Sequence, residues 1–337
     1  MKINNTSVGR LWIAVLKKTL AVSFLVSYSI APLKASASGY LEGLMKYIPG
    51  SSDFLILGDI GAADEGAYTD SVFTEDDIPE TYTEFLNNTG INPEEDIHFI
   101  AGFGFIGGLN DMPVGGAVIR MDYEEEKLLE SLRAEREKLG VPVNEKQLSR
   151  LTLYGFPVER EGGEVEIWIA FPDSEHLLIG NPEGLSLINS LIEEGEGQLT
   201  GESPIYGFAF PEEGYLLSAA LILNDNLFSP DSAEFLTANP IIAALKGLEA
   251  IQFTLGFDER VLHLVLNGFR NNEVENAQLA GMLNGFKGMM MMASAENPEA
   301  AMYMDMVNIF YSPDSVTLRA VIPESMFAPG EEEEYTE

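Results

Sequence analysis

Short apolar runs separated by turn-forming residues dominate the chain from about residue 50 onward. Some runs alternate apolar and polar positions, as in the segment 164–170, and others are continuous, as in 97–105. Both patterns are typical of strands when glycine, proline, asparagine or aspartate bounds the run. They predict strands at 53–60, 97–105, 114–121, 164–170, 176–179, 208–210, 215–223, 251–255, 261–266, 309–311 and 316–321.

Three of the intervals between these strands share one composition. The intervals 171–175, 211–214 and 312–315 each place proline and acidic residues after an aromatic residue and before an apolar strand. Proline favours turns through its fixed φ, and aspartate through side-chain hydrogen bonds to the backbone. These intervals therefore predict β-hairpins, and the segment 256–260 predicts a fourth.

Apolar residues at helical spacing predict helices at 80–88, 122–139, 182–194, 232–247 and 273–295. The second of these is the clearest. Asp122 and Glu125 have the spacing of a capping box at its start. Leucines then repeat along one face, and Gly140 follows as a residue that favours the end of a helix.

The order of these elements predicts an α+β fold with two similar halves. Each half, 38–195 and 202–328, holds a mostly antiparallel sheet of hairpins with helices packed on one face. The glycine-containing segment 195–201 links the halves. The acidic residues of 329–337 predict a disordered tail.

The first 37 residues have the pattern of an export signal. A basic start precedes an apolar run at 19–33, which is shorter than the roughly 20 residues of a membrane span. Ala35 and Ala37 are small residues at the positions that a signal peptidase reads, so we expect the mature chain to begin at Ser38. This predicts a periplasmic or extracellular bacterial protein with no membrane span after cleavage.

Composition narrows the classes of function. The chain carries a net charge of −35, and the signal contains five of its 19 basic residues and no acidic ones. The mature charge would therefore be −40, which repels nucleic acid and anionic lipid and favours basic partners and loosely bound divalent cations. The absence of cysteine excludes disulfides, thiol catalysis and lipid attachment at an N-terminal cysteine.

A glycine motif in the segment 102–107 matches the spacing G-x-G-x-x-G, with Asp122 lying 20 residues beyond its first glycine. In a dinucleotide site these glycines open a helix whose N-terminus holds the pyrophosphate. Gly108, Asn110 and Pro113 follow and leave no room for that helix. We therefore predict a glycine-rich strand and loop, and no cofactor.

Methionines cluster near the C-terminus. Met289, Met290, Met291 and Met292 are candidates for binding Cu(I), a soft ion that thioethers suit. Leu279, Met282, Leu283, Phe286 and Met290 recur at helical spacing, which favours a helix that packs its methionines into the core. The alternation of Met302, Met304 and Met306 predicts one face of a strand.

No motif of known chemistry involves the three histidines, His98, His176 and His263. H-E-x-x-H and G-x-S-x-G are both absent, so we predict structural roles and assign no catalytic residue. A hydrolase would require a histidine close to a carboxylate and a hydroxyl in a cleft. Among the many carboxylates, Asp53 with Asp59, the segment 94–96 and the segment 224–226 suit only loose Ca²⁺ binding.

Four segments carry a resemblance to known proteins. The segment 45–53 has the order hydrophobe, proline, small residues, aspartate, and the acidic segment 94–97 precedes a glycine-containing strand. The segments 177–183 and 315–324 continue the likeness. In these features the chain resembles a broad group of uncharacterised exported bacterial envelope proteins. The resemblance implies a domain of two α+β halves and no functional residue.

These observations favour a non-enzymatic exported protein with a structural or interaction role in the bacterial envelope. A periplasmic carrier of an apolar ligand or lipid is a second reading, because sheets backed by helices can enclose an apolar pocket. A hydrolase with an unrecognised site is a third. The expected partner is an envelope protein or an apolar ligand.

Overall fold

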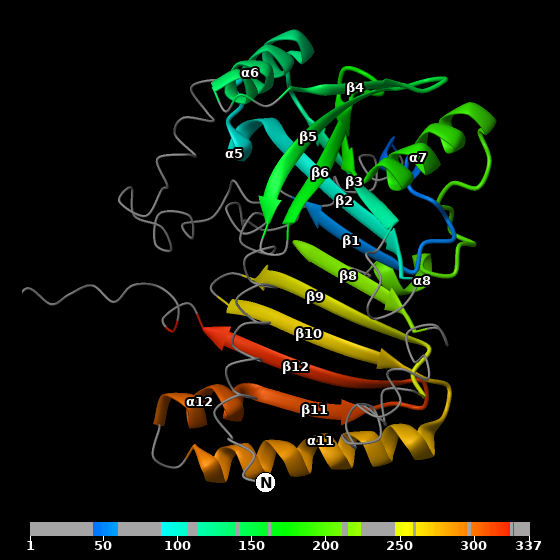
Figure 1. The fold of residues 1–337 in the computed structure, drawn as a ribbon. Coiled ribbons are helices and arrows are strands. Elements are labelled where there is room, and N and C mark those ends of the chain that lie inside the picture. Colours follow the sequence, from blue (N-terminus) through cyan, green and yellow to red (C-terminus); the bar gives the residue numbers. More distant parts are fainter. Residues whose placement is uncertain are drawn as a thin grey trace, which may run out of the picture.

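The computed structural model describes residues 43–59, 89–106, 114–138, 140, 142–160, 163–210, 215–223, 247–258, 261–294, 298–323 and 326. Its centre is a 12-stranded sheet in which every neighbouring pair is antiparallel (Figure 1). The spatial order is β11-β12-β10-β9-β8-β1-β2-β3-β7-β6-β5-β4. The predicted α+β class with antiparallel pairing is thereby confirmed.

The strands are β1 (Phe54–Asp59), β2 (Ile97–Phe105), β3 (Val114–Met121), β4 (Asn144–Gln147), β5 (Thr152–Arg160), β6 (Gly163–Ala170), β7 (His176–Gly180), β8 (Leu217–Ile222), β9 (Ala250–Asp258), β10 (Val261–Phe269), β11 (Val307–Tyr311) and β12 (Ser315–Pro323). The helices are α5 (Pro93–Asp96), α6 (Glu125–Lys138), α7 (Pro182–Glu194), α8 (Tyr206–Ala209), α11 (Glu273–Ala293) and α12 (Pro298–Met306).

The sheet runs without a break across the boundary that the sequence suggests at 195–201. Strand β1 pairs with β2 on one side and with β8 on the other, so one strand joins the two parts of the sheet. Pro49 also forms an isolated bridge with Gln198 inside the predicted linker. The segments 38–195 and 202–328 therefore contribute to one sheet.

One face of the sheet, which we call the covered face, packs against α7, α8 and the segment 43–48. This face carries the largest apolar cluster, in which Leu55 and Phe103 from the sheet meet Leu185 from α7. From the segment 43–48, Leu44 and Ile48 are fully buried. The first described residues therefore belong to the core.

Helix α7 forms where the sequence predicts it, and its ends explain why. Asn181 Oδ1 accepts a hydrogen bond from Gly184 N (2.8 Å), and Pro182 occupies the first turn. These are favoured N-terminal features. Gly195 ends the helix at a φ of 68°, which glycine adopts without strain.

The other face, which we call the opposite face, carries a helix near each end. Leu128 of α6 packs with Leu177 of β7 in one cluster, and Leu279 of α11 packs with Val316 of β12 in another. Between them a row of register partners is apolar on successive strands. This apolar row consists of Ile56, Ala219, Phe253, Leu266, Leu318 and Ile309. Leu266 is 39% exposed and the others are half-buried.

A polar row lies one residue away on the covered face, and it crosses β9, β10 and β12. Thr317 Oγ1 donates to Asn267 Oδ1 (2.7 Å), and Asn267 Nδ2 donates to Gln252 Oε1 (2.8 Å). Gln252 Nε2 in turn donates to the carbonyl of Phe208 in α8 (2.6 Å). Because these side chains are opposite one another in the ladder, a one-residue slip of any strand would break the chain of hydrogen bonds.

Both edge strands of the sheet are protected. Strand β4 is four exposed residues long and includes Glu145 and Lys146, and charged residues discourage further pairing. At the other edge, Ser312 N donates to Ser315 O, so the odd-numbered residues of β11 turn their backbone groups away from β12. Lys287 of α11 donates to one of these groups, the carbonyl of Val307 (2.6 Å). Figure 1 shows α11 running along β11.

Most predicted elements are confirmed, and several need correction. The segment 208–210 is not a strand, because residues 206–209 form α8. The alternating methionines 302–306 lie in α12 rather than in a strand. Helix α6 begins at Glu125, so Asp122 is not its cap. The backbone N–H of Asp122 donates instead to the carbonyl of Asp96. Strands β4 and β5 were not predicted, and the helices lie on both faces of the sheet rather than on one as predicted.

Other predictions concern residues that the structure does not describe. The signal peptide 1–37, the helix 80–88, residues 232–246 of the helix 232–247 and the acidic tail 329–337 lie outside the described residues. Within the described ranges, no helix has both the length and the apolar character to cross a membrane.

Candidate functional site

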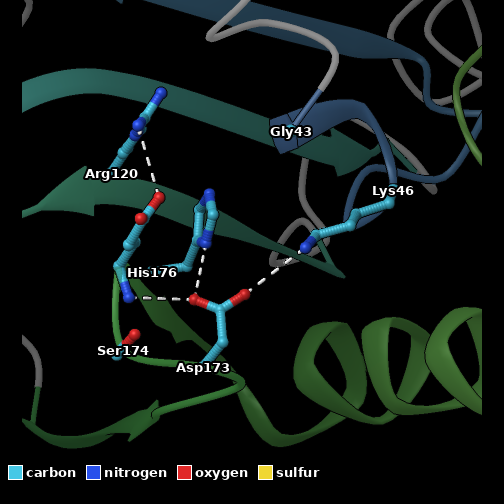
Figure 2. Close-up of a pocket in the computed structure, with 7 residues that line it drawn as sticks. Gly43, Lys46, Arg120, Asp173, Ser174 and His176 are labelled. Atoms are coloured by element: carbon cyan, nitrogen blue, oxygen red, sulfur yellow. Dashed lines mark hydrogen bonds and ion pairs between the residues drawn. The ribbon is translucent and has the colours of Figure 1, made fainter.

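A hollow of about 440 Å³ opens on the covered face where three parts of the chain meet. Its lining is Gly43, Lys46, Arg120, Asp173, Ser174, Glu175 and His176. The segment 43–48, strand β3 and the turn before β7 contribute these residues (Figure 2). The pocket therefore depends on the docking of the segment 43–48 against β3 and the turn before β7.

Strand pairing places the central side chains. Arg120 on β3 and His176 on β7 are register partners, so their side chains lie on the same face of the sheet. The predicted turn 171–175 is confirmed, and Asp173 Oδ1 accepts a hydrogen bond from Glu175 N (3.0 Å). This local bond is the aspartate turn chemistry that the sequence suggests, and it aims the carboxylate at the pocket.

Asp173 is the hub of the site. Its Oδ1 also contacts Nδ1 of His176 (2.7 Å), and its Oδ2 accepts from the hydroxyl of Tyr47 (2.6 Å) and from Nζ of Lys46 (3.3 Å). With the Glu175 bond, two carboxylate oxygens therefore meet four donors. The Tyr123 hydroxyl holds the same turn from behind, with Asp173 O at 2.5 Å and His176 O at 2.9 Å as acceptors.

The hydrogen bonds decide the charge at the hub. Burial alone would raise the pKa of Asp173, but the bonds from Tyr47, Glu175 N and His176 outweigh burial and hold this pKa well below its usual range. Burial, followed by the hydrogen bond to Asp173, raises the pKa of Tyr47. Burial also raises the pKa of Tyr123. The site therefore contains an ionised carboxylate that accepts from the neutral phenol of Tyr47, while the neutral phenol of Tyr123 donates to the backbone of the same turn.

His176 has its hydrogen bonding satisfied at only one of its two ring nitrogens among the described residues. It is only 5% exposed, and its ring stacks at an angle against Tyr47 with centroids 5.2 Å apart. An ionised Asp173 at Nδ1 fixes the proton on that nitrogen. Nε2 then has no hydrogen-bond partner among the residues that the structure describes, although it is buried. A buried polar atom without a partner is uncommon in proteins and calls for an explanation.

Two cations flank the histidine in Figure 2. Lys46 pairs with Asp173 and Arg120 pairs with Glu175, each at 3.3 Å. The Lys46 side chain is 47% exposed and the Arg120 side chain 24% exposed. The pocket therefore presents cationic donors in a chain that is strongly acidic overall.

The other two histidines each contact one charged side chain near the surface. Nε2 of His98 lies 3.2 Å from Asp122 Oδ2, and the two side chains are 30% and 73% exposed. Nδ1 of His263 lies 3.3 Å from the guanidinium of Arg319, also at the surface. In the described ranges, no three histidine, aspartate or glutamate side chains gather closely enough to hold a metal ion.

The glycines of the motif 102–107 lie in a paired strand, and two of the carboxylate groups accept hydrogen bonds from backbone N–H groups. Gly102 and Gly104 are paired positions inside β2, in keeping with the predicted strand. Asp53 accepts from Ile106 N, and Asp96 accepts from Asn92 N. The segment 224–226 lies outside the described residues.

The methionine prediction is partly wrong. Leu279 and Leu283 pack in the core as expected. Met282, Met290, Met289 and Met292 are instead 40%, 38%, 58% and 73% exposed on α11, where the outer side of the helix has nothing packed on it in the described part of the chain. Successive helical side chains point about 100° apart, so four consecutive methionines cannot converge on one ion. Copper binding stays an untested prediction.

Comparison with known proteins adds little. No protein-family model matches the chain, and no curated protein matches it. Crystal form III of TP0453 is similar over 84% of this chain and 95% of its own, with 11% identity and a TM-score of 0.44. Crystal form I of TP0453 covers 85% and 98%, with 10% identity and a TM-score of 0.42. Likeness at this level carries no argument about function.

Proposed function

We propose that this chain is an exported, non-enzymatic binding protein of the bacterial envelope, and that the pocket at His176 recognises a polar group of its ligand. The observation that carries this proposal is Nε2 of His176, which is buried in the pocket lining and has no partner within the described part of the chain. Leaving such an atom unsatisfied costs about 1–3 kcal/mol. A ligand that reaches Nε2 would recover this cost.

Two features support a preformed binding site. Asp173 is occupied by four donors, and its neighbours hold one another in fixed geometry. The lining residues come from rigid strands and from a segment packed into the core. Such preorganised polar groups suit recognition, because little conformational entropy is lost when a ligand binds. We also propose that 38–195 acts as the binding half and 202–328 as a similar, supporting half.

Native purification with mass spectrometry tests this proposal. The full-length protein would be expressed in a bacterium, purified from the envelope fraction and analysed intact. We expect a mature chain that begins at Ser38 and carries a small molecule of defined mass. We expect Gly43→Leu, which fills the space beside His176, to lose the molecule. The control His98→Gln should retain it. A molecule that all three proteins carry equally, or no molecule, would refute the pocket's role.

A hydrolase is a second candidate, favoured by the Asp173–His176 pair. An ionised aspartate at Nδ1 leaves Nε2 able to accept a proton, as in a general base. In the residues that the structure describes, no hydroxyl lies within hydrogen-bond distance of Nε2, so water would have to be the nucleophile. Turnover of p-nitrophenyl esters or phosphodiesters that is lost in His176→Gln and kept in His98→Gln would favour this candidate.

A carrier of apolar ligands is a third candidate, favoured by the apolar row on the opposite face. Leu266 is 39% exposed, and its neighbours in the row are half-buried. Fluorescent fatty acids would probe this surface. Binding that Leu266→Asp weakens and Gly43→Leu leaves unchanged would favour the carrier over the polar pocket.

A further inference from the structure

We infer that the group recognised in the pocket is an oxyanion, a carboxylate or phosphate carried by a small ligand. In this assignment His176, Lys46 and Arg120 donate to it. The inference rests on the proposed binding function and names the chemical class of the ligand. It follows from counting which hydrogen-bonding capacity in the pocket is already used.

The carboxylate of Asp173 is fully engaged as an acceptor. Oδ1 of Asp173 accepts from Glu175 N and contacts the donor nitrogen of His176, while Oδ2 accepts from Tyr47 and Lys46. Two carboxylate oxygens offer about four lone-pair directions, so this group has no capacity left for a ligand. Glu175, the other carboxylate in the lining, faces Arg120 at 3.3 Å. A ligand rich in donors would therefore find no capacity at Asp173 and would depend on Glu175 and on Nε2 of the neutral His176 ring.

Two cationic donors lie beside His176 in the pocket. An ammonium group carries three N–H bonds, and the hydrogen bond from Lys46 to Asp173 uses one of them. The guanidinium of Arg120 carries five N–H bonds in a planar fork that matches the geometry of an oxyanion. Both cations line the same hollow as His176. An acceptor-rich, negatively charged group is the complement of this arrangement.

His176 links anion binding to a proton. Because Nδ1 donates to Asp173, Nε2 can hydrogen-bond an oxyanion only when the ring is protonated. The bound anion would stabilise the imidazolium from the Nε2 side, as Asp173 does from the Nδ1 side. The other charged or titratable groups that face this ring are Asp173, Glu175, Arg120, Lys46, Tyr47 and Tyr123. Binding should therefore be accompanied by proton uptake at His176.

Glycine at position 43 provides the space. A Cβ atom built on Gly43 would lie 3.8 Å from Nε2 of His176, and the glycine leaves that volume open. The hollow of about 440 Å³ is within the range of small-molecule sites. A larger side chain at position 43 would occupy the place of the anion without changing any charge.

Nuclear magnetic resonance of the histidine rings tests the inference directly, because the chain has only three histidines. The protein would be titrated with acetate, with inorganic phosphate and with neutral acetamide at constant pH and ionic strength. The ring nitrogens of His176 should move toward imidazolium values with the two anions. Acetamide should bind about tenfold more weakly and cause no protonation. His98 and His263 should not move.

Variants separate the ways in which the inference can fail. Gly43→Leu and the surface variant Lys46→Met should each reduce the response of His176 to acetate, and Glu145→Gln should not. An equal response to acetate and acetamide, or equal movement of all three histidines, would overturn the oxyanion assignment. A further outcome is that neither anion shifts the His176 resonances while the native protein still carries a co-purified molecule that Gly43→Leu lacks. In that case the binding function stands and the oxyanion assignment is wrong. If both results are negative, the proposed function itself fails.

Discussion

Two histidine–aspartate pairs in this molecule share their chemistry and differ in their surroundings. His98 and Asp122 lie 3.2 Å apart where water reaches both side chains. His176 and Asp173 lie 2.7 Å apart with the histidine side chain 6% exposed, and the aspartate meets three further donors. The first pair is open to solvent, whereas the second keeps one buried nitrogen without a partner among the described residues. Burial and the number of fixed donors, rather than residue type, thus distinguish a site from a surface contact.

Removing the two aspartates should give the largest contrast. Asp173→Ala leaves the hydroxyl of Tyr47 and Nδ1 of His176 without an acceptor, so we expect a loss of about 3 kcal/mol in the free energy of unfolding. Asp122→Ala removes an exposed pair and should cost less than about 0.5 kcal/mol. Urea unfolding of both variants measures the contrast. Equal losses would show that the buried network contributes no more than the surface pair.

Acid should weaken the buried pair selectively. The pKa of Asp173 is lower in the folded protein than its usual value of about 3.9. The carboxylate therefore stabilises the fold above that pH, and the contribution is lost as the pH falls below it. The stability gap between the native protein and Asp173→Asn should narrow from pH 6 to pH 3.

The surface pair provides the control for this pH experiment. Asp122→Asn should follow the native protein closely throughout the series, because its carboxylate is mostly exposed. A gap for Asp173→Asn that stays constant between pH 6 and pH 3 would contradict the role assigned to that carboxylate.

A smaller effect should follow from deleting one hydroxyl. Tyr47→Phe keeps the ring packed against His176 and removes one donor to Asp173. We expect a loss of about 1–2 kcal/mol, because the bond involves a charged acceptor. Tyr311→Phe on the exposed edge should cost almost nothing. Thermal unfolding followed by circular dichroism compares the two.

The smallest effect should come from Lys46. Its ion pair with Asp173 is 3.3 Å long and its side chain is 47% exposed. We expect Lys46→Met to change the free energy of unfolding by no more than about 0.5 kcal/mol. The same variant should weaken anion binding, so stability and ligand response would separate at this residue. A large loss of stability would place Lys46 in the structural network instead.

Local chemistry made much of the fold predictable. Helix α7 has the predicted bounds because Asn181, Pro182 and Gly195 each act on their own neighbours. The turn 171–175 was predictable for the same reason. Strand β5 was missed because Gly155 and Pro157 interrupt its apolar pattern, and only pairing with β4 and β6 makes it a strand. Its neighbours in space, rather than its own residues, determine its conformation.

The candidate site was not predictable from spacing. Tyr47 and Asp173 are 126 residues apart, and Arg120 meets His176 only through the β3–β7 ladder. One usable signal was present, because aspartate three residues before a histidine in a predicted turn places both on one side of the chain. Helix α11 carries methionines whose burial was mispredicted for a related reason. Its apolar residues have helical spacing, but the sheet edge that it covers occupies only one side of it.

The docking of the segment 43–48 also affects when the pocket forms during folding. Tyr47 near the start of the chain contacts Asp173, which lies more than 120 residues later. Closing so long a loop costs entropy before any contact is gained. The site should therefore be among the last parts of the molecule to form. A ligand bound at His176 would then favour chains in which the segment 43–48 has docked, because both walls of the pocket must be in place to contact it.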